Sequence, residues 1–170
     1  MKILETERLV LRELCATDAA FILQLVNDPA WLRFIGDKGI RTLEAARNYI
    51  LNGPVEMYQR HGFGLWLVEL KEGKIPIGIC GLIKREVLED IDLGFAFLPD
   101  YLRKGYGFEA ASASISFGKE RFGLKRIVAV LSPDNVASTR LLEKLGFHFE
   151  RLVRLSSEAP EINLYGAVLR

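Results

Sequence analysis

The chain has 170 residues, of which 49% are hydrophobic, enough for one well-buried core and too few for two substantial domains. We therefore expect residues 1–170 to form a single domain. The 23 Lys and Arg residues and 22 Asp and Glu residues leave a net charge of +1, which argues against a nucleic-acid or membrane partner. Any anion site must therefore be local.

Soft metal ligands and apolar spans are both scarce in the sequence. Cys15 and Cys80 lie far apart without a C-x-x-C pair, and the histidines are only His61 and His148, so we expect neither a disulfide framework nor a metal site. No stretch approaches the ~18 apolar residues of a membrane span. These features predict a soluble, cytoplasmic protein.

The first part of the chain predicts a strand followed by two helices. Residues 8–14 alternate as a strand does, and residues 17–18 can cap a helix that ends at Asp28-Pro29. Thr42 can cap a second helix, which we expect to stop at Gly53-Pro54. The segment between the helices, residues 31–39, is expected to be an irregular aromatic loop.

The remaining pattern predicts a sheet with helical insertions. Residues 63–70 are apolar on both faces, as in a central strand, and a turn at 71–74 makes them a hairpin with residues 75–86. Further on we expect strands at 91–99, 126–132, 148–155 and 162–170, a helix from Lys104 to Gly123, and a helix over 136–145 closed by Gly146-Phe147.

The stretch LRKGYGFEA, residues 102–110, predicts an anion site. A glycine turn at a helix N-terminus leaves main-chain N–H groups unpaired and pointing the same way, in front of the positive end of the helix dipole. Two other interpretations stay open at this point. The glycines can simply shape a tight connection, or they can belong to a dinucleotide-binding fold, although Lys125 stands where that fold needs an acid.

Two segments together resemble the signature of the GCN5-related N-acetyltransferases. They are GFAFLPDYLRKGYGFEA and, one strand later, NVASTRLLEKLGFHFE. The likeness is greatest to the branch that acetylates N-terminal residues of ribosomal proteins, and TERLVLREL and INLYGAVL extend it over essentially the whole chain. Leu102 departs from the Gln or Arg of the wider family, and Arg103 from the Gly common in this branch.

The resemblance implies a fold and a donor. The fold is mixed α/β, with a twisted, mostly antiparallel sheet of about seven strands, a splayed parallel pair and about four helices. The donor is acetyl-CoA, with its diphosphate on the main-chain N–H groups of residues 103–108 and its pantetheine arm beside the strand that ends at Phe97-Leu98. The implied contacts are Phe97, Leu98, Arg103, Lys104, Gly105, Tyr106, Gly107, Phe108, Asn135 and Ser138.

The resemblance also implies catalytic roles. Asn135 matches the residue that bonds the pantetheine amides, and Ser138 the proposed proton donor to the leaving thiolate; ordinary capping and helical positions are the alternatives. Glu158 is our candidate base, with Asp92 as an alternative, because neither histidine is persuasively placed.

Trp31 and Phe34 lie in the loop that helps to wall the acceptor pocket in this family, unless they only pack in the core. We expect direct acetyl transfer to a protein N-terminal α-amine. The alternatives are a small-molecule amine (an aminoglycoside, a polyamine or an amino acid), a non-catalytic CoA-binding module, or an enzyme that prefers a longer acyl donor. A homodimer is compatible with this interpretation.

Overall fold

A computed structural model describes residues 1–170. Eight strands cover Lys2–Glu5 (β1), Leu9–Arg12 (β2), Leu65–Leu70 (β3), Pro76–Ile83 (β4), Asp92–Phe97 (β5), Arg126–Leu131 (β6), His148–Val153 (β7) and Ile162–Val168 (β8). They form one sheet in the order β1-β2-β3-β4-β5-β6-β8-β7. Every neighbouring pair is antiparallel except β5 and β6, which confirms the expected mixed architecture.

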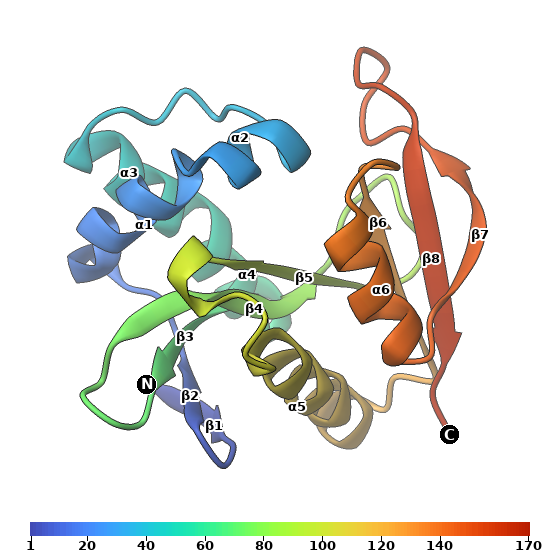
Figure 1. Cartoon of the computed structure of the whole chain (residues 1–170), viewed down its shortest axis with the longest axis horizontal. Helices are drawn as coiled ribbons and strands as arrows, with labels where there is room; N and C mark the ends of the chain where they lie inside the picture. Colours follow the sequence, from blue (N-terminus) through green and yellow to red (C-terminus); the bar gives the residue numbers. More distant parts are fainter.

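Six α-helices surround the sheet (Figure 1). They cover Ala19–Val26 (α1), Pro29–Phe34 (α2), Leu43–Ile50 (α3), Glu56–His61 (α4), Tyr106–Phe122 (α5) and Val136–Lys144 (α6). Helices α1, α2 and α3 lie on one side of β4 and β5, and α5 lies on the other. None of the helices has the length and apolar character that crossing a membrane requires.

The central strands bury both of their faces, as the apolar runs predict. In β3, Trp66 and Val68 pack in the cluster that includes Ala110 and Ala111 of α5, whereas Leu67 packs among residues of α1 and α3. Side chains alternate across a strand, so a strand covered by helices on both sides needs apolar residues at consecutive positions.

Helices α5 and α6 end as predicted, and each is followed by a glycine with positive φ. Gly123 follows α5 with φ +66°, and Gly146 follows α6 with φ +93°. The Phe147 N–H then donates to the Leu142 carbonyl at 2.9 Å, and the Phe147 side chain is buried. This is the pattern of a glycine C-cap followed by an apolar contact.

Three expectations about the first half of the chain are wrong. Residues 2–5 form an additional strand, β1, so the sheet has one strand more than expected. Residues 29–34 were expected to belong to a helix stop and an irregular loop, but they form α2. The helix begins here because Asp28 accepts a hydrogen bond from the Ala30 N–H at 3.1 Å and Pro29 stands at the first helical position. The helix expected to stop at Gly53-Pro54 continues to His61.

The continuation past Pro54 has a physical reason. Residues Leu51–Val55 form a π-helical turn between α3 and α4. Proline has no N–H to donate and its ring clashes with the preceding turn of an α-helix. The wider π-helical turn accommodates Pro54 without ending the helix, so Gly53 and Pro54 mark a π-bulge and not a helix end.

The parallel pair splits soon after it forms. Asp92 of β5 is in register with Val128 of β6, and the Val128 N–H donates to the Ile91 carbonyl at 3.1 Å. No further pair joins the two strands, although β5 stays paired with β4 along its whole length, up to Gly78 with Phe97. The main chains of β5 and β6 therefore diverge from Asp92 onward and leave a gap with unpaired edges.

Candidate functional site

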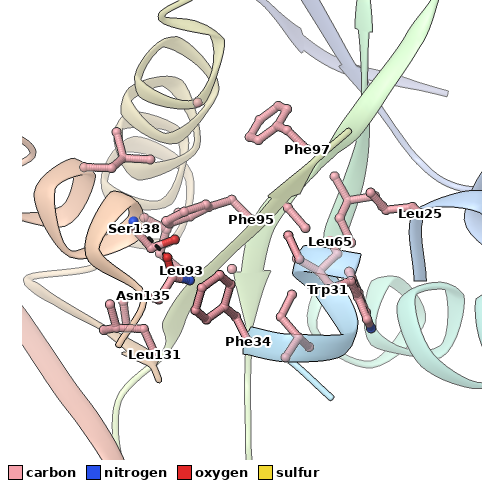
Figure 2. Close-up of a pocket in the computed structure, with 18 of the residues that line it drawn as sticks. Leu25, Trp31, Phe34, Leu65, Leu93, Phe95, Phe97, Leu131, Asn135 and Ser138 are labelled. Atoms are coloured by element: carbon pink, nitrogen blue, oxygen red, sulfur yellow. Dashed lines mark hydrogen bonds between the residues drawn. The ribbon is translucent and has the colours of Figure 1, made fainter. Parts of the chain in front are cut away.

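A cavity of about 720 Å³ occupies this gap. Leu93–Phe97 of β5 and 129–131 of β6 form its walls, together with residues from α1, α2, α5 and α6. Of the 36 residues that line it, 24 are hydrophobic. Figure 2 shows Phe95 and Leu93 between Asn135 and Ser138, at the start of α6, on one side and Phe34 and Trp31 of α2 on the other. The cavity suits an elongated, mostly apolar ligand.

The glycine turn lies at one end of this cavity and has free donors. Arg103, Gly105, Gly107 and Phe108 all line the cavity. None of the hydrogen bonds within the chain uses the main-chain N–H groups of residues 103–108. Arg103 and Gly105 adopt φ +61° and +84°, a conformation that turns successive N–H groups toward one side. The turn therefore has the donors that a diphosphate needs.

Arg8 and Glu109 fix this turn, although no sequence pattern connects them. Arg8 Nε donates to Glu109 Oε1 at 2.8 Å, and its Nη1 donates to the Lys104 carbonyl at 3.0 Å. The Thr6 hydroxyl and the Arg8 N–H donate to Glu109 Oε2. Although partial burial opposes it, these hydrogen bonds keep the Glu109 pKa below its usual range. The carboxylate thus holds β2 against the start of α5.

Asn135 and Ser138 stand together at the start of α6. Asn135 Oδ1 accepts a hydrogen bond from the Ser138 N–H at 3.2 Å, so the capping role considered for Asn135 is present. The Asn135 Nδ2 and the Ser138 hydroxyl donate to no group of the chain. Both residues line the cavity, facing Phe95 and Leu93 (Figure 2).

The other expected contact residues divide into two groups. Phe97 lines the cavity, and a Cβ at Gly107 would lie 3.6 Å from its ring, so the end of β5 lies against the glycine turn. Leu98 is buried in the core around α1 and α3, and it does not line the cavity. Lys104 and Tyr106 also point elsewhere: the Lys104 amine lies 5.9 Å from the centre of the Tyr101 ring, and the Arg8 guanidinium stacks 4.3 Å from that of Tyr106.

Trp31 and Phe34 both line the cavity from α2. Trp31 is 5% exposed and belongs to the core cluster of α1 and α3, and its indole N–H is buried without a partner. Phe34 is half-buried, and the Arg33 guanidinium lies over its ring at 4.7 Å. Trp31 therefore serves the core as well as the cavity wall.

The candidate bases are not at the cavity surface. Asp92 is 1% exposed, and its Oδ2 accepts a hydrogen bond from Arg85 Nε at 2.7 Å. Burial raises the pKa of Asp92 even though Arg85 opposes this. Glu158 lies exposed in the loop between β7 and β8, and it does not line the cavity. The structure brings neither carboxylate together with Ser138.

Three cations that the sequence did not single out also line the cavity: Lys144 of α6, Lys38 and Arg85. Lys38 lies between α2 and α3, and Arg85 lies in the loop after β4. Neither Lys38 nor Arg85 belongs to a recognisable motif. Only the fold brings their two loops to one cavity. No group of three or more His, Cys, Asp or Glu side chains is arranged to hold a metal ion.

The chain is similar in sequence to known acetyltransferases. The family model described as Acetyltransferase (GNAT) domain matches residues 8–148. The uncharacterized N-acetyltransferase YoaA of Bacillus subtilis is 32% identical over 153 residues, which make up 89% of this chain and 86% of the relative.

Solved structures share the whole architecture. An acetyltransferase of the GNAT family from Bacillus anthracis is 26% identical with a TM-score of 0.78, over 99% of this chain and 98% of that one. RimL, a ribosomal L7/L12 alpha-N-protein acetyltransferase solved in complex with coenzyme A, is 18% identical with a TM-score of 0.84, over 99% of this chain and 98% of that one. The likeness to RimL concerns the fold alone.

Proposed function

Because this chain belongs to the GNAT acetyltransferase domain family, whose members use acetyl-CoA, we propose that it transfers the acetyl group of acetyl-CoA directly to a primary amine, with a protein N-terminal α-amine as acceptor. The observation that carries the proposal is the row of unpaired main-chain N–H groups at residues 103–108, at one end of a largely apolar cavity between two diverging strands.

The diphosphate of acetyl-CoA binds at the glycine turn in this proposal. Gly105 and Gly107 allow the main chain to approach an anion closely, and the helix dipole of α5 favours negative charge at that end. Arg103 and Lys144 are cations that line the same cavity and can neutralise further phosphate charge. Lys104 and Tyr106 then contribute main-chain N–H groups, and Leu98 contributes packing only.

The pantetheine arm runs along the unpaired edge of β5. A strand edge offers N–H and C=O groups at regular intervals, so it can pair with the amides of the arm as another strand would. The thioester then lies in the narrowing gap toward Asp92, where unpaired main-chain N–H groups can stabilise the oxyanion that develops when the amine attacks. No covalent enzyme intermediate is needed.

Asn135 and Ser138 complete the reaction in this proposal. The free Nδ2 of Asn135 donates to a pantetheine carbonyl, while its Oδ1 remains the cap of α6. As the tetrahedral intermediate collapses and the C–S bond breaks, the Ser138 hydroxyl gives a proton to the leaving CoA thiolate. The acceptor nitrogen loses its proton to solvent, and Ser138 regains one from solvent. A thiol with a pKa near ~8.5 is a fair leaving group without help, so we expect this donation to contribute only ~10- to 100-fold.

The acceptor assignment has a physical basis as well as a family one. An α-amine with pKa ~7.8 is roughly 15% neutral at pH 7, whereas a lysine amine with pKa ~10.4 is less than ~0.1% neutral. Because no carboxylate or histidine lines the cavity beside Ser138, an amine that needs little help to lose its proton is the better acceptor. Glu158 retains a role as base only if its loop closes over the bound acceptor.

The test is an acetyl-transfer assay with acetyl-CoA and a panel of N-terminal peptides, polyamines, aminoglycosides and free amino acids. We expect free CoA to be released and the acetyl group to appear on the α-amine of peptides, located by mass spectrometry. Binding of acetyl-CoA without transfer to any amine would favour a non-catalytic CoA-binding module, and faster transfer to polyamines would contradict the acceptor assignment.

A further inference from the structure

Lys38, Tyr49 and Arg85 form a group of unused hydrogen-bond donors on the cavity wall. All three residues line the cavity. Lys38 and Tyr49 make no side-chain hydrogen bond or ion pair, and Arg85 uses only its Nε, which donates to Asp92 at 2.7 Å. The lysine amine, the tyrosine hydroxyl and the two terminal guanidinium nitrogens therefore remain free. We call these three residues the cationic cluster.

The cationic cluster lies away from the diphosphate site. Arg85 is bound to Asp92 at the first residue of β5, whereas the glycine turn lies against Phe97 at its last residue. The two positions are five residue steps apart along an extended strand, which is about 16 Å at ~3.3 Å per step. The phosphates of coenzyme A are therefore not the anions that this cluster is placed to bind.

The positive charges of the cluster are only partly balanced by carboxylates of the protein. Partial burial lowers the pKa of Lys38, the neighbouring charge of Arg85 lowers it further, and no carboxylate is close enough to oppose these effects. Asp28, the one acid that lines the cavity, accepts a hydrogen bond from the Ala30 N–H and caps α2. Asp92 offsets Arg85, so Lys38 and Arg85 together with Asp92 leave one positive charge.

Tyr49 adds a neutral donor to these cations. Burial raises the pKa of its phenol, so the hydroxyl keeps its proton at neutral pH and can donate to an anion. A guanidinium with two free nitrogens, an ammonium and a hydroxyl together match the oxygens of a carboxylate. One uncompensated positive charge suits a carboxylate better than a phosphate dianion.

We propose that the acceptor of this enzyme is an amine that also carries a carboxylate, which Lys38, Tyr49 and Arg85 bind while the amine faces the thioester. The inference rests on the proposed function, since the carboxylate is part of the acceptor. The carboxylate is either the α-carboxylate of a free amino acid or an acidic side chain near a peptide N-terminus. Polyamines and aminoglycosides are excluded, because the cluster repels a second positive charge.

The test compares acceptors that differ only in this charge. One pair is alanine and alaninamide, and the other is a short peptide with N-terminal Ala and Asp or Asn at the next position. We expect the wild type to use the carboxylate member of one pair about tenfold more efficiently, by kcat/KM, as a charged hydrogen bond would give. The pair that shows the preference identifies the source of the carboxylate.

Three variants connect the preference to the cluster. Lys38→Gln should abolish most of the preference, Lys38→Arg should retain it, and Tyr49→Phe should weaken it a few-fold. Lys125→Gln is the matched control, because Lys125 is exposed, its amine is unpaired and it does not line the cavity. Arg85 is left unchanged, since its removal would strand the buried Asp92 carboxylate without a partner.

Binding is measured separately so that the two proposals can fail independently. The same peptide and amino-acid pairs are titrated by calorimetry into protein saturated with CoA, which cannot react. Equal kcat/KM and equal affinity for both members of each pair, or a preference unaltered by Lys38→Gln, would overturn the inference. Tighter binding of the carboxylate members without acetylation of any amine would support the inference and overturn the proposed function.

Discussion

Arg8 and Glu109, 101 positions apart, are joined by a 2.8 Å hydrogen-bonded ion pair that holds the strand β2 to the first turn of α5. Through Nη1 the same guanidinium donates to the carbonyl of Lys104, in the middle of the glycine turn. The peptide groups that we propose to bind the diphosphate are therefore oriented from outside the turn. Preorganised donors bind an anion without the cost of ordering a loop.

Glu109→Gln tests this orientation. The amide can still accept one hydrogen bond, but it cannot balance the charge of Arg8, so the turn loosens. We expect the KM for acetyl-CoA to rise about three- to tenfold, with kcat changed less than twofold, as loss of a partly exposed ion pair would give. Glu120→Gln is the control, because Glu120 is an exposed acid of α5 without a partner. An unchanged KM would show that Glu109 only stabilises the fold.

The glycine turn is tested by two alanine variants with the same backbone strain. Gly105 and Gly123 both adopt positive φ, at the two ends of α5, and alanine in this conformation costs roughly 1–2 kcal/mol of stability at either position. Only at Gly105 would the added Cβ meet a neighbouring group, 3.2 Å from Arg8 Nη2, whose guanidinium holds the turn. We expect Gly105→Ala to weaken CoA binding at least tenfold, measured by calorimetry, while Gly123→Ala binds normally; equal losses would contradict a role specific to the turn.

Ser138→Ala tests proton donation to the leaving thiolate. The hydroxyl bonds to nothing else in the chain, so its loss should leave the fold and the acetyl-CoA affinity intact and reduce kcat by ~10- to 100-fold. Ser116→Ala, at an exposed position of α5, should have no effect. If single-turnover measurements gave the wild-type rate for Ser138→Ala, the acid role would have to be abandoned.

Stability should depend on pH through the ion pair of Arg12 and Asp18. Arg12 Nη2 donates to Asp18 Oδ1 at 2.8 Å, and Asp18 is 8% exposed. Burial alone would raise the pKa of Asp18, but the hydrogen bonds from Arg12 and Cys15 lower it overall. The folded state thus binds a proton at Asp18 less readily than the unfolded state does. This stabilisation is present above the unfolded pKa of about 3.9 and is lost as the pH falls through the folded value.

Asp18→Asn should therefore lower the free energy of unfolding by about 2 kcal/mol at pH 7, and by much less near pH 2, in urea titrations at both values. Asp37→Asn is the control, because Asp37 pairs with Arg41 in an exposed position and should contribute little. A deficit of equal size at both pH values would mean that shape, not charge, makes Asp18 important.

The elements that the sequence predicted well are those whose signals are local. The β3–β4 hairpin, α5 and α6 carry apolar periodicity and glycine stops within a few residues of each boundary. The helix through Pro54 was missed because a π-helical turn depends on how the segment packs. Asp28-Pro29 was correctly taken as a helix end, but it also begins the next helix, α2.

The same distinction between local signals and long-range packing applies to the residues of the candidate site. Gly105, Asn135 and Ser138 belong to motifs with fixed spacing, so the sequence could predict that they share one site, and all three line the cavity. Arg8, Lys38 and Arg85 could not be found, since only the folded chain brings Arg8 to the glycine turn and Lys38 and Arg85 to the cavity wall. Sequence spacing could not show that Asp92 is buried behind Arg85, nor that Lys104 and Tyr106 direct their side chains away from the cavity.

The central claim is that main-chain N–H groups of residues 103–108 bind the diphosphate of coenzyme A. The most direct measurement is an NMR titration of the 15N-labelled protein with CoA, followed by one with pantetheine, which lacks the phosphates. We expect the amide resonances of residues 103–108 to shift most strongly, and only with CoA. Saturable CoA binding that leaves these amides unmoved, or equal shifts with pantetheine, would contradict the claim.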